Sequence, residues 1–332
     1  MLRGKGVNLT ITLPIVLILV MLVAAPLFAT AYYLSILTDI LVWLALSISW
    51  QFFSGSTNYI SLGSAAFFGV GLYFAAKYLY LSVGTGHYPI LPFPVVVLLA
   101  GLVNFVLALA IGVVTLRLKG IYFVILTFAI SQVAMNLISW YEAAVTGTLG
   151  TIIPVFFNAQ AIYYTMLICA SAILLFVVLL RRSKFGLGLK MIGESEEAAA
   201  HVGVNTGLYK ILGFAISAML MGFVGGCFAI RLPYVNAGMA FDFSYSLYPA
   251  VMTLLGGAGT ILGPIIGSAT ITSLSDYLSV TLGSYFLIIL GLILIIIIVL
   301  MPNGIMGMVE KARTKVWSWI NEEKAKAPEM PP

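Results

Sequence analysis

Charged residues are scarce in this sequence. Only 8% of the 332 residues are Asp, Glu, Lys or Arg, whereas soluble domains usually contain about 25%. Hydrophobic residues make up 62%, and a water-soluble fold cannot bury that much apolar surface. The net charge of +5 comes from Lys and Arg that flank apolar segments. This position next to apolar segments indicates that the basic residues set the orientation of helices in membrane lipid, and we expect no nucleic-acid partner.

Reactive side chains are also scarce. Cys169 and Cys227 lie in apolar segments without CxxC spacing, which argues against a disulfide framework or a zinc site. His87 and His201 are the two histidines, so we expect no metal site and no Ser-His-Asp catalytic group. A phosphate-binding loop of the GxxxxGK type is absent as well. The sequence therefore predicts a protein that is not an enzyme and carries no cofactor of its own.

Long apolar segments fill most of the chain. A bilayer core about 30 Å thick needs about 20 apolar residues per helix, and an open sheet cannot span it. The candidate segments are residues 10–29, 33–53, 59–81, 92–115, 121–141, 161–180, 210–230, 244–258, 261–280 and 284–301. These segments predict an all-α polytopic membrane protein with about ten, within a range of eight to ten, transmembrane helices.

Residues 244–267 fit this pattern least well. The first apolar stretch there has about 15 residues, against the roughly 20 expected of a span. It runs into Gly256, Gly257 and Gly259, and Gly263-Pro264 follows. Short crossings, broken helices and a re-entrant pair all agree with this sequence. The glycines indicate either close helix packing or an unwound backbone that lines a cavity.

Basic clusters predict the orientation, because Lys and Arg accumulate in cytoplasmic loops. The clusters are Arg3 and Lys5; Arg117 and Lys119; Arg181, Arg182, Lys184, Lys190 and Lys210; and Lys311, Arg313 and Lys315. Ten crossings place all of them on one side, with both termini cytoplasmic. Lys77 and Arg231 are single exceptions at the external side. We expect one transmembrane domain over residues 1–309 and a cytoplasmic tail over residues 310–332.

The longest cytoplasmic loop, residues 181–210, contains a predicted short helix. Ser195 suits the N-cap, Glu196 and Glu197 suit the first turn, and Gly203 suits the stop. The helix should have about two turns and a length of about 10 Å, and Asn205 or Thr206 should cap the next membrane helix. Such a rigid cross-piece on the membrane surface could receive force from a motor. A solvated loop with a chance helix is the alternative.

Small and polar residues inside the apolar segments are candidates for a translocation path. Gln132 and Asn136 are four residues apart and share one helix face. The candidate set is Ser61, Gly63, Ser64, Thr127, Gln132, Asn136, Gly256, Gly257 and Gly259. Hydrogen bonding between helices would account for the polar members equally well.

Four collinear segments resemble the LivM-type permeases of branched-chain amino-acid ABC transporters. Residues 61–71 are similar to the family's SLGHAAFFGIGAY stretch, with Ser64 where His is common, and residues 116–123 are similar to LRLRGxYF. Residues 185–210 resemble its cytoplasmic loop, and residues 256–267 resemble GGxGxxxGPxxGA. The departures are Leu187 and Gly193, where the loop often has Arg, and Gln132, where Glu is frequent.

The resemblance implies the permease subunit of an ABC importer. Its partners would be two cytoplasmic ABC ATPase subunits that bind the ATP, a second related permease and an external solute-binding protein. Coupling to the ATPase is implied for Glu194, Ser195, Glu196, Glu197, Ala198, Ala199, Ala200 and Gly203. The expected substrates are branched-chain or other hydrophobic amino acids. The alternatives are urea, short amides or other small solutes, and a stand-alone secondary transporter.

Overall fold

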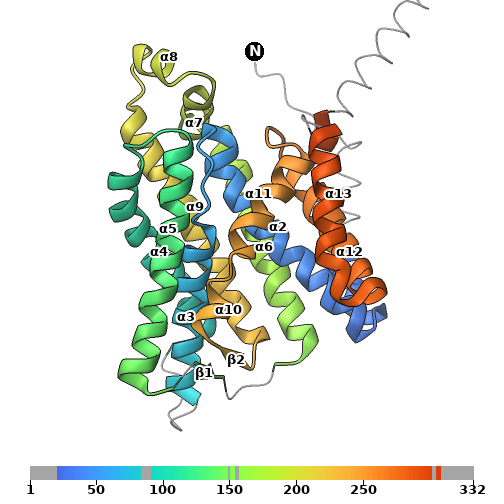
Figure 1. Ribbon diagram of the computed structural model, residues 1–332. Helices are drawn as coiled ribbons and strands as arrows, with labels where there is room; N and C mark the ends of the chain where they lie inside the picture. Colours follow the sequence, from blue (N-terminus) through green and yellow to red (C-terminus); the bar gives the residue numbers. More distant parts are fainter. Residues whose placement is uncertain (1–20, 84–90, 149, 154–156, 301–303, 308–332) are drawn as a thin grey trace, which may run out of the picture.

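The computed structural model describes residues 21–83, 91–148, 150–153, 157–300 and 304–307. Almost all of this chain is helical (Figure 1). The main helices are α2 (Ala31–Thr57), α3 (Ser64–Val83), α4 (Phe93–Thr115), α5 (Ile121–Tyr141), α6 (Ala159–Arg182), α7 (Lys184–Glu194), α8 (Glu196–His201), α9 (Thr206–Phe228), α10 (Ala237–Ala240), α11 (Ser244–Gly256), α12 (Leu262–Leu282) and α13 (Phe286–Leu300). The shorter elements are η1 (Glu142–Thr146), η2 (Ala229–Arg231), η3 (Gly283–Tyr285), β1 (Thr151–Ile152) and β2 (Tyr234–Val235).

Six of the described helices are long and apolar enough to cross a membrane, namely α2, α3, α4, α5, α6 and α9, with short extensions of α5 and α9. This confirms the all-α polytopic membrane fold. The number of about ten spans is not confirmed, because α11 has 13 residues and α13 has 15, fewer than a full crossing needs. Of the predicted segment 10–29, only residues 21–28 are described, and they are helical. The tail, residues 310–332, lies outside the described residues.

Helix α9 forms the centre of the bundle. Its span is 72% buried, the largest share among the six. The packing depends on small residues, because Cβ atoms at Gly71, Gly222 and Gly225 would overlap backbone or side-chain atoms of the neighbouring helix. This is the close approach that small residues permit in membrane helices. By contrast, the span that contains α5 is only 17% buried, so α5 lies at the edge of the bundle.

The two ends of the bundle differ in charge. Helices α7 and α8 lie at one end, at the top of Figure 1, and the antiparallel pair β1–β2 lies at the other. Lys119, from the loop between α4 and α5, forms an ion pair with Glu196 of α8, so two of the predicted basic clusters share one end. At the opposite end, Arg231 pairs with Asp39 of α2. Arg231, one of the two exceptions to the predicted orientation, is therefore neutralised by the carboxylate of Asp39.

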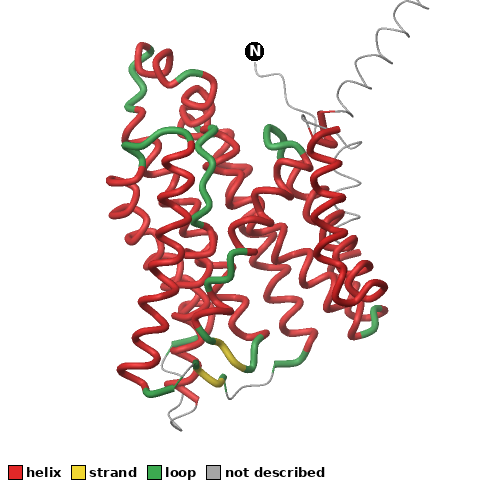
Figure 2. The backbone as a smooth tube through the Cα atoms, in the orientation of Figure 1, coloured by secondary structure: helices red, strands yellow, loops and turns green. Residues whose placement is uncertain are grey.

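The predicted span 59–81 is only partly helical. Residues 58–63, called the extended stretch below, belong to no helix or strand; Asn58 itself is left-handed with a φ of +59°, and α3 begins at Ser64. Figure 2 shows this stretch as a loop that descends from the α7 end into the middle of the bundle. Its backbone is satisfied by side chains: Trp50 Nε1 donates to Ser61 O at 2.8 Å, and Leu62 N donates to Thr127 Oγ1 at 3.1 Å. Non-helical backbone is tolerated at membrane depth when protein groups satisfy it in this way.

Helices α11 and α12 form a tight hairpin. Gly256 and Gly263 lie in backbone contact, since a Cβ on either would overlap a carbonyl oxygen of the other arm. The turn between them is held by Gln51 of α2, whose Nε2 donates to the carbonyl oxygens of Ala258 (2.8 Å) and Thr260 (2.5 Å). Among the alternatives for residues 244–267, the structure therefore shows a short helix that reverses directly into a longer one.

Candidate functional site

The loop 181–210 folds into two short helices. Ser195 Oγ accepts a hydrogen bond from Ala198 N at 3.3 Å, and Gly203 has a φ of +92° just beyond the end of α8. Val204 N donates to Ala199 O, and Gly203 N donates to Ala200 O, which is the Schellman arrangement of a helix end. Asn205 caps α9. These predicted caps are confirmed, and α8 has six residues.

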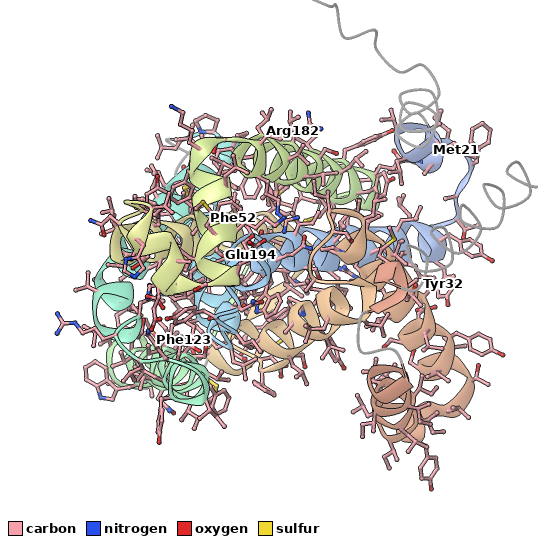
Figure 3. The ribbon with its side chains drawn as sticks, turned by 90° about the horizontal axis from the view of Figure 1, so that it is seen from above. Met21, Tyr32, Phe52, Phe123, Arg182 and Glu194 are labelled. Atoms are coloured by element: carbon pink, nitrogen blue, oxygen red, sulfur yellow. The ribbon has the colours of Figure 1, made fainter. Side chains whose placement is uncertain are left out.

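One part of the loop differs from the prediction. Residues 184–194 form a separate helix, α7, whose N-cap is Ser183. Glu194 is therefore the last residue of α7, and Ser195 is the extended residue between α7 and α8 that caps α8. Figure 3 looks onto this end of the molecule and shows Glu194 over the bundle near Phe52 of α2.

Helix α8 has one buried face and one open face. Ala199 is buried, whereas Glu194, Ser195, Glu197, Ala198, Ala200 and Gly203 are exposed. The exposed residues of α8 itself are Glu197, Ala198, Ala200 and His201, so its open face carries one carboxylate, one imidazole and small side chains. It is a surface to which another protein can bind closely, while Ala199 and Glu196 hold α8 to the bundle.

Glu196 is the main link between α8 and the membrane helices. Its Oε1 accepts from Lys210 Nζ at 2.5 Å, and its Oε2 accepts from Tyr59 OH at 2.8 Å. Lys119 Nζ lies 3.3 Å from Oε2. Lys210 also donates to Tyr59 OH at 3.2 Å, and its ammonium lies 4.8 Å from the centre of the Tyr59 ring. One carboxylate thus connects α8, the α4–α5 loop, the first turn of α9 and the extended stretch 58–63.

The pKa values in this cluster reflect its geometry. Burial favours the neutral form of Glu196, but the hydrogen bonds from Lys210 and Tyr59 outweigh burial and lower the pKa of Glu196. Burial, with the hydrogen bond to Glu196, raises the pKa of Tyr59 to about 12. Glu196 is therefore a carboxylate and Tyr59 a neutral donor throughout the physiological range.

Helix α7 packs directly on the end of α2. A Cβ on Gly193 would overlap the carbonyl oxygen of Ser56, so this position requires glycine. Asn58, which ends α2 with a φ of +59°, donates from Nδ2 to Gly193 O at 2.8 Å. The departure from Arg at Gly193 therefore has a structural reason. Leu187, the other departure, is exposed.

Four of the predicted path residues come together deeper in the bundle. Ser61, Gly63 and Ser64 lie at the end of the extended stretch, beside Thr127 of α5. Thr127 Oγ1 accepts from Leu62 N, and a Cβ on Gly63 would lie 3.4 Å from Thr127 Cβ. A small cavity, with room for about one water molecule, adjoins Ser61 and Ser64. Ser61 lies about one to two helical turns below the end of α2, because its main-chain groups are hydrogen-bonded to Trp50 and Ser54.

The remaining path residues lie elsewhere. Gln132 is half-buried and Asn136 is exposed on the outer side of α5, and Asn136 Nδ2 donates to Gln132 O at 2.9 Å. Gly256 and Gly257 are buried in the α11–α12 hairpin, whereas Gly259 is exposed in its turn. The structure does not bring either group to the cavity beside Ser64.

Sequence reasoning missed the partners of Glu196. Tyr59 was placed at the start of a membrane span, and Lys119 and Lys210 were assigned only to the basic clusters. The available signal was the position of Lys210 next to the apolar segment 210–230, because a charge at the start of a membrane helix requires a partner if it is buried. No group of three or more His, Cys, Asp or Glu side chains occurs within the described part of the chain.

Comparison with known proteins agrees with this geometry. A family model described as "Branched-chain amino acid transport system / permease component" matches residues 32–298. The high-affinity branched-chain amino acid transport system permease protein LivM of Salmonella typhimurium is 24% identical over 323 residues, which cover 88% of this chain and 74% of that protein. LivM of Escherichia coli K12 is 24% identical over 325 residues, 89% of this chain and 74% of its own.

More distant matches cover less of the chain. The autoinducer 2 import system permease protein LsrC of Salmonella typhi is 27% identical over 143 residues, or 42% of this chain and 40% of that protein. No solved structure matches significantly. The family model covers most of the chain and the relatives are permeases, not enzymes. This chain therefore belongs to the branched-chain amino-acid transport permease family of ABC transporters and is a multi-pass protein of the cell membrane.

Proposed function

We propose that this chain forms the translocation path for branched-chain or other hydrophobic amino acids in an ABC importer. The support is the similarity to two LivM proteins over almost nine-tenths of the chain. The cavity beside Ser64 is lined by aromatic side chains and serine hydroxyls, which is the mixed lining typical of sites for small, largely apolar ligands.

The observation that carries the proposal is the link through Glu196. An ATPase subunit bound to the open face of α8 would move Glu196, and Glu196 is hydrogen-bonded to Tyr59. Tyr59 leads into the extended stretch that ends at Ser61 and Ser64. Movement of α8 thus reaches the path through a few polar contacts. Two ATPase subunits would bind and hydrolyse the ATP, and the permease would alternate between outward-open and inward-open states.

The edge position of α5 supports a second permease subunit. Asn136 is exposed on the least buried span, and an amide group in contact with hydrocarbon is unfavourable. A related permease facing α5 would enclose Asn136 and Gln132 at the boundary between the two subunits. The fifth component would be an external solute-binding protein, which supplies most of the substrate specificity.

The test is uptake of labelled leucine into vesicles that contain the assembled transporter, with and without ATP. In the variant Glu196→Gln we expect at least a tenfold loss of uptake, while ATP hydrolysis and subunit assembly persist, because motion no longer passes from α8 to Tyr59. The matched control is Glu194→Gln, since the exposed Glu194 carboxylate pairs with the exposed Lys190 at 3.9 Å and exposed pairs contribute little. Its uptake should stay within twofold of the original protein.

Other outcomes would contradict the proposal. Uptake without nucleotide would show a stand-alone transporter. ATP-driven uptake of urea or a short amide with no leucine uptake would assign the chain to a different substrate. Equal uptake by the Glu196 and Glu194 variants would remove Glu196 from the coupling route while leaving the transport assignment intact.

A further inference from the structure

The cavity at the start of α3 has an uncharged lining. Its polar groups are the hydroxyls of Ser54, Ser61, Ser64 and Ser217, and the rest of the surface is mainly aromatic. None of the described side chains that line it is ionisable. Any charged group that binds here must therefore be held by hydroxyls and by backbone dipoles.

Three of the four hydroxyls already have partners. Ser217 Oγ donates to Ser49 O at 2.7 Å, Ser54 Oγ accepts from Ser61 N at 3.3 Å, and Ser61 Oγ accepts from Gly63 N at 3.2 Å. Ser64 is different: it is 1% exposed, and its Oγ has no hydrogen-bond partner among the described residues. A buried hydroxyl without a partner is unfavourable, so the Ser64 hydroxyl marks a position for a hydrogen-bonding ligand.

Two helix N-termini meet at the same place. The 20-residue helix α3 begins at Ser64, and the 13-residue helix α11 begins at Ser244. They are joined where Ala65 N donates to Ser246 Oγ at 2.9 Å. A helix N-terminus carries a partial positive charge and favours anions. Helices that begin inside a membrane protein use this property to hold the anionic group of a substrate.

We propose that the Ser64 hydroxyl and the N-terminus of α3 bind the carboxylate of the transported solute, while the aromatic lining contacts its apolar body. This inference rests on the proposed function and specifies its substrate class as a carboxylate with an apolar side chain. The cavity is too small for an amino acid in this structure. Binding therefore requires α3 and α9 to separate, as they do if the two permease states alternate.

The test is direct binding to the assembled transporter in nanodiscs, without the external binding protein, whose own specificity would mask that of the permease. The probes are leucine and leucinamide, which share a side chain but differ in the carboxylate. We expect the original protein to bind leucine more tightly than leucinamide. Ser64→Ala should weaken leucine binding about tenfold and leucinamide binding by less, because the hydrogen bond that it removes is stronger to a carboxylate than to a neutral amide.

Two further variants keep the result interpretable. Ser64→Thr retains a hydroxyl and should retain the preference for leucine. Ser268→Ala removes a fully buried hydroxyl that donates to Ile265 O, away from the cavity, and should bind both probes like the original protein. Loss of binding in Ser268→Ala as well as Ser64→Ala would show a general packing effect and overturn the assignment of Ser64.

The result that overturns the proposal is equal affinity for leucine in the original protein and Ser64→Ala, or no preference for leucine over leucinamide. The cavity would then hold water only. ATP-driven leucine uptake in the same preparation distinguishes a failure of the carboxylate site from a failure of the proposed transport function. Intact uptake with unchanged affinities removes the carboxylate site alone, whereas absent uptake removes the proposed function.

Discussion

Lys210 illustrates how a single buried charge determines local structure. It lies in the first turn of α9 and is 5% exposed, and a buried ammonium is strongly unfavourable unless it is paired. Glu196 and Tyr59 provide the pairing. Glu196 therefore has two roles: its carboxylate neutralises Lys210, and the same contact fixes the position of α8 on the bundle.

Replacing this lysine should release α8. In Lys210→Met we expect a loss of about 1–3 kcal/mol in the free energy of unfolding, because Glu196 loses its closest partner, and at least a tenfold fall in ATP-driven leucine uptake. Unfolding in detergent and uptake in vesicles are the measurements. Lys190→Met is the control, since the Lys190 side chain is 73% exposed and exposed pairs contribute little. Equal behaviour of the two variants would contradict the structural role of Lys210.

The lowered pKa of Glu196 predicts a specific pH dependence. A carboxylate with a depressed pKa stabilises the fold above its usual value, near 4.3, and that stabilisation is lost as the pH falls through the lower folded value. Tyr59 acts in the opposite sense: its contribution is present below pH 10 and is lost as the pH rises towards about 12. Thermal unfolding of the original protein and of Glu196→Gln, compared from pH 8 to 3.5, should show a difference that shrinks only below about pH 5. A difference that shrinks between pH 8 and 6 would implicate another group.

Local and distant residue contacts differ in how well sequence predicts them. Ser195, Gly203 and Asn205 were predicted correctly, because a cap is formed by groups within a few residues of each other. The partners of Glu196 were not, since Tyr59 is 137 residues away along the chain. The close contact between Gly193 and Ser56 likewise depends on how α7 lies against α2.

At the scale of elements, α8 is too short to be stable alone. A six-residue helix does not repay the cost of nucleation, so its stability comes from both caps, from buried Ala199 and from Glu196. The α11–α12 hairpin is stabilised differently, by direct backbone contact at Gly256 and Gly263. Each of these elements is held by specific groups rather than by apolar area.

The end of α8 offers a test of this view. Gly203 has a φ of +92° and no atom within 4 Å of a Cβ placed on it, so Gly203→Ala adds backbone strain without a clash. We expect it to destabilise α8 by about 1 kcal/mol and to speed hydrogen exchange at residues 198–204. Gly207→Ala, in the first turn of α9 and without such a φ, should leave exchange unchanged or slower. Faster exchange in both variants would contradict this account of the helix end.

The main error at this scale was the helix predicted over residues 59–81. Apolar composition predicts burial in the membrane, but it does not distinguish a helix from an extended chain whose backbone is satisfied by neighbours. The non-helical form of residues 58–63 depends on Trp50, Ser54 and Thr127, which come from α2 and α5. By contrast, the span predicted over residues 121–141 matches α5 to the residue.

At the scale of the whole molecule, the helices differ in how much of their surface other helices cover. Helix α9 is enclosed by α2, α3, α4 and α6, whereas α5 has a largely uncovered surface. Sequence predicted the membrane fold and the placement of two basic clusters at one end, because both follow from composition and local charge. It could not predict which helix would lie at the edge.

A cross-linking experiment tests what covers α5. In a background where Cys169 and Cys227 are replaced by Ala, a cysteine at Asn136 should form a disulfide with the second permease subunit on mild oxidation, given a matching cysteine there. Leu175→Cys on α6 is the control, because Leu175 is also exposed but lies on a different helix. Electrophoresis without reductant would reveal the linked pair. Linkage through Leu175 and none through Asn136 would place the subunit boundary on α6.

The non-helical residues 58–63 have a mechanical consequence, because they lie directly before the first residue of α3, Ser64. A helix advances about 1.5 Å per residue and a strand about 3.3 Å, so residues that are not helical can shorten by winding onto the start of α3. On the proposed function, a displacement of Tyr59 by Glu196 would change where α3 begins, and Ser64 would then move without any change in the length of α2.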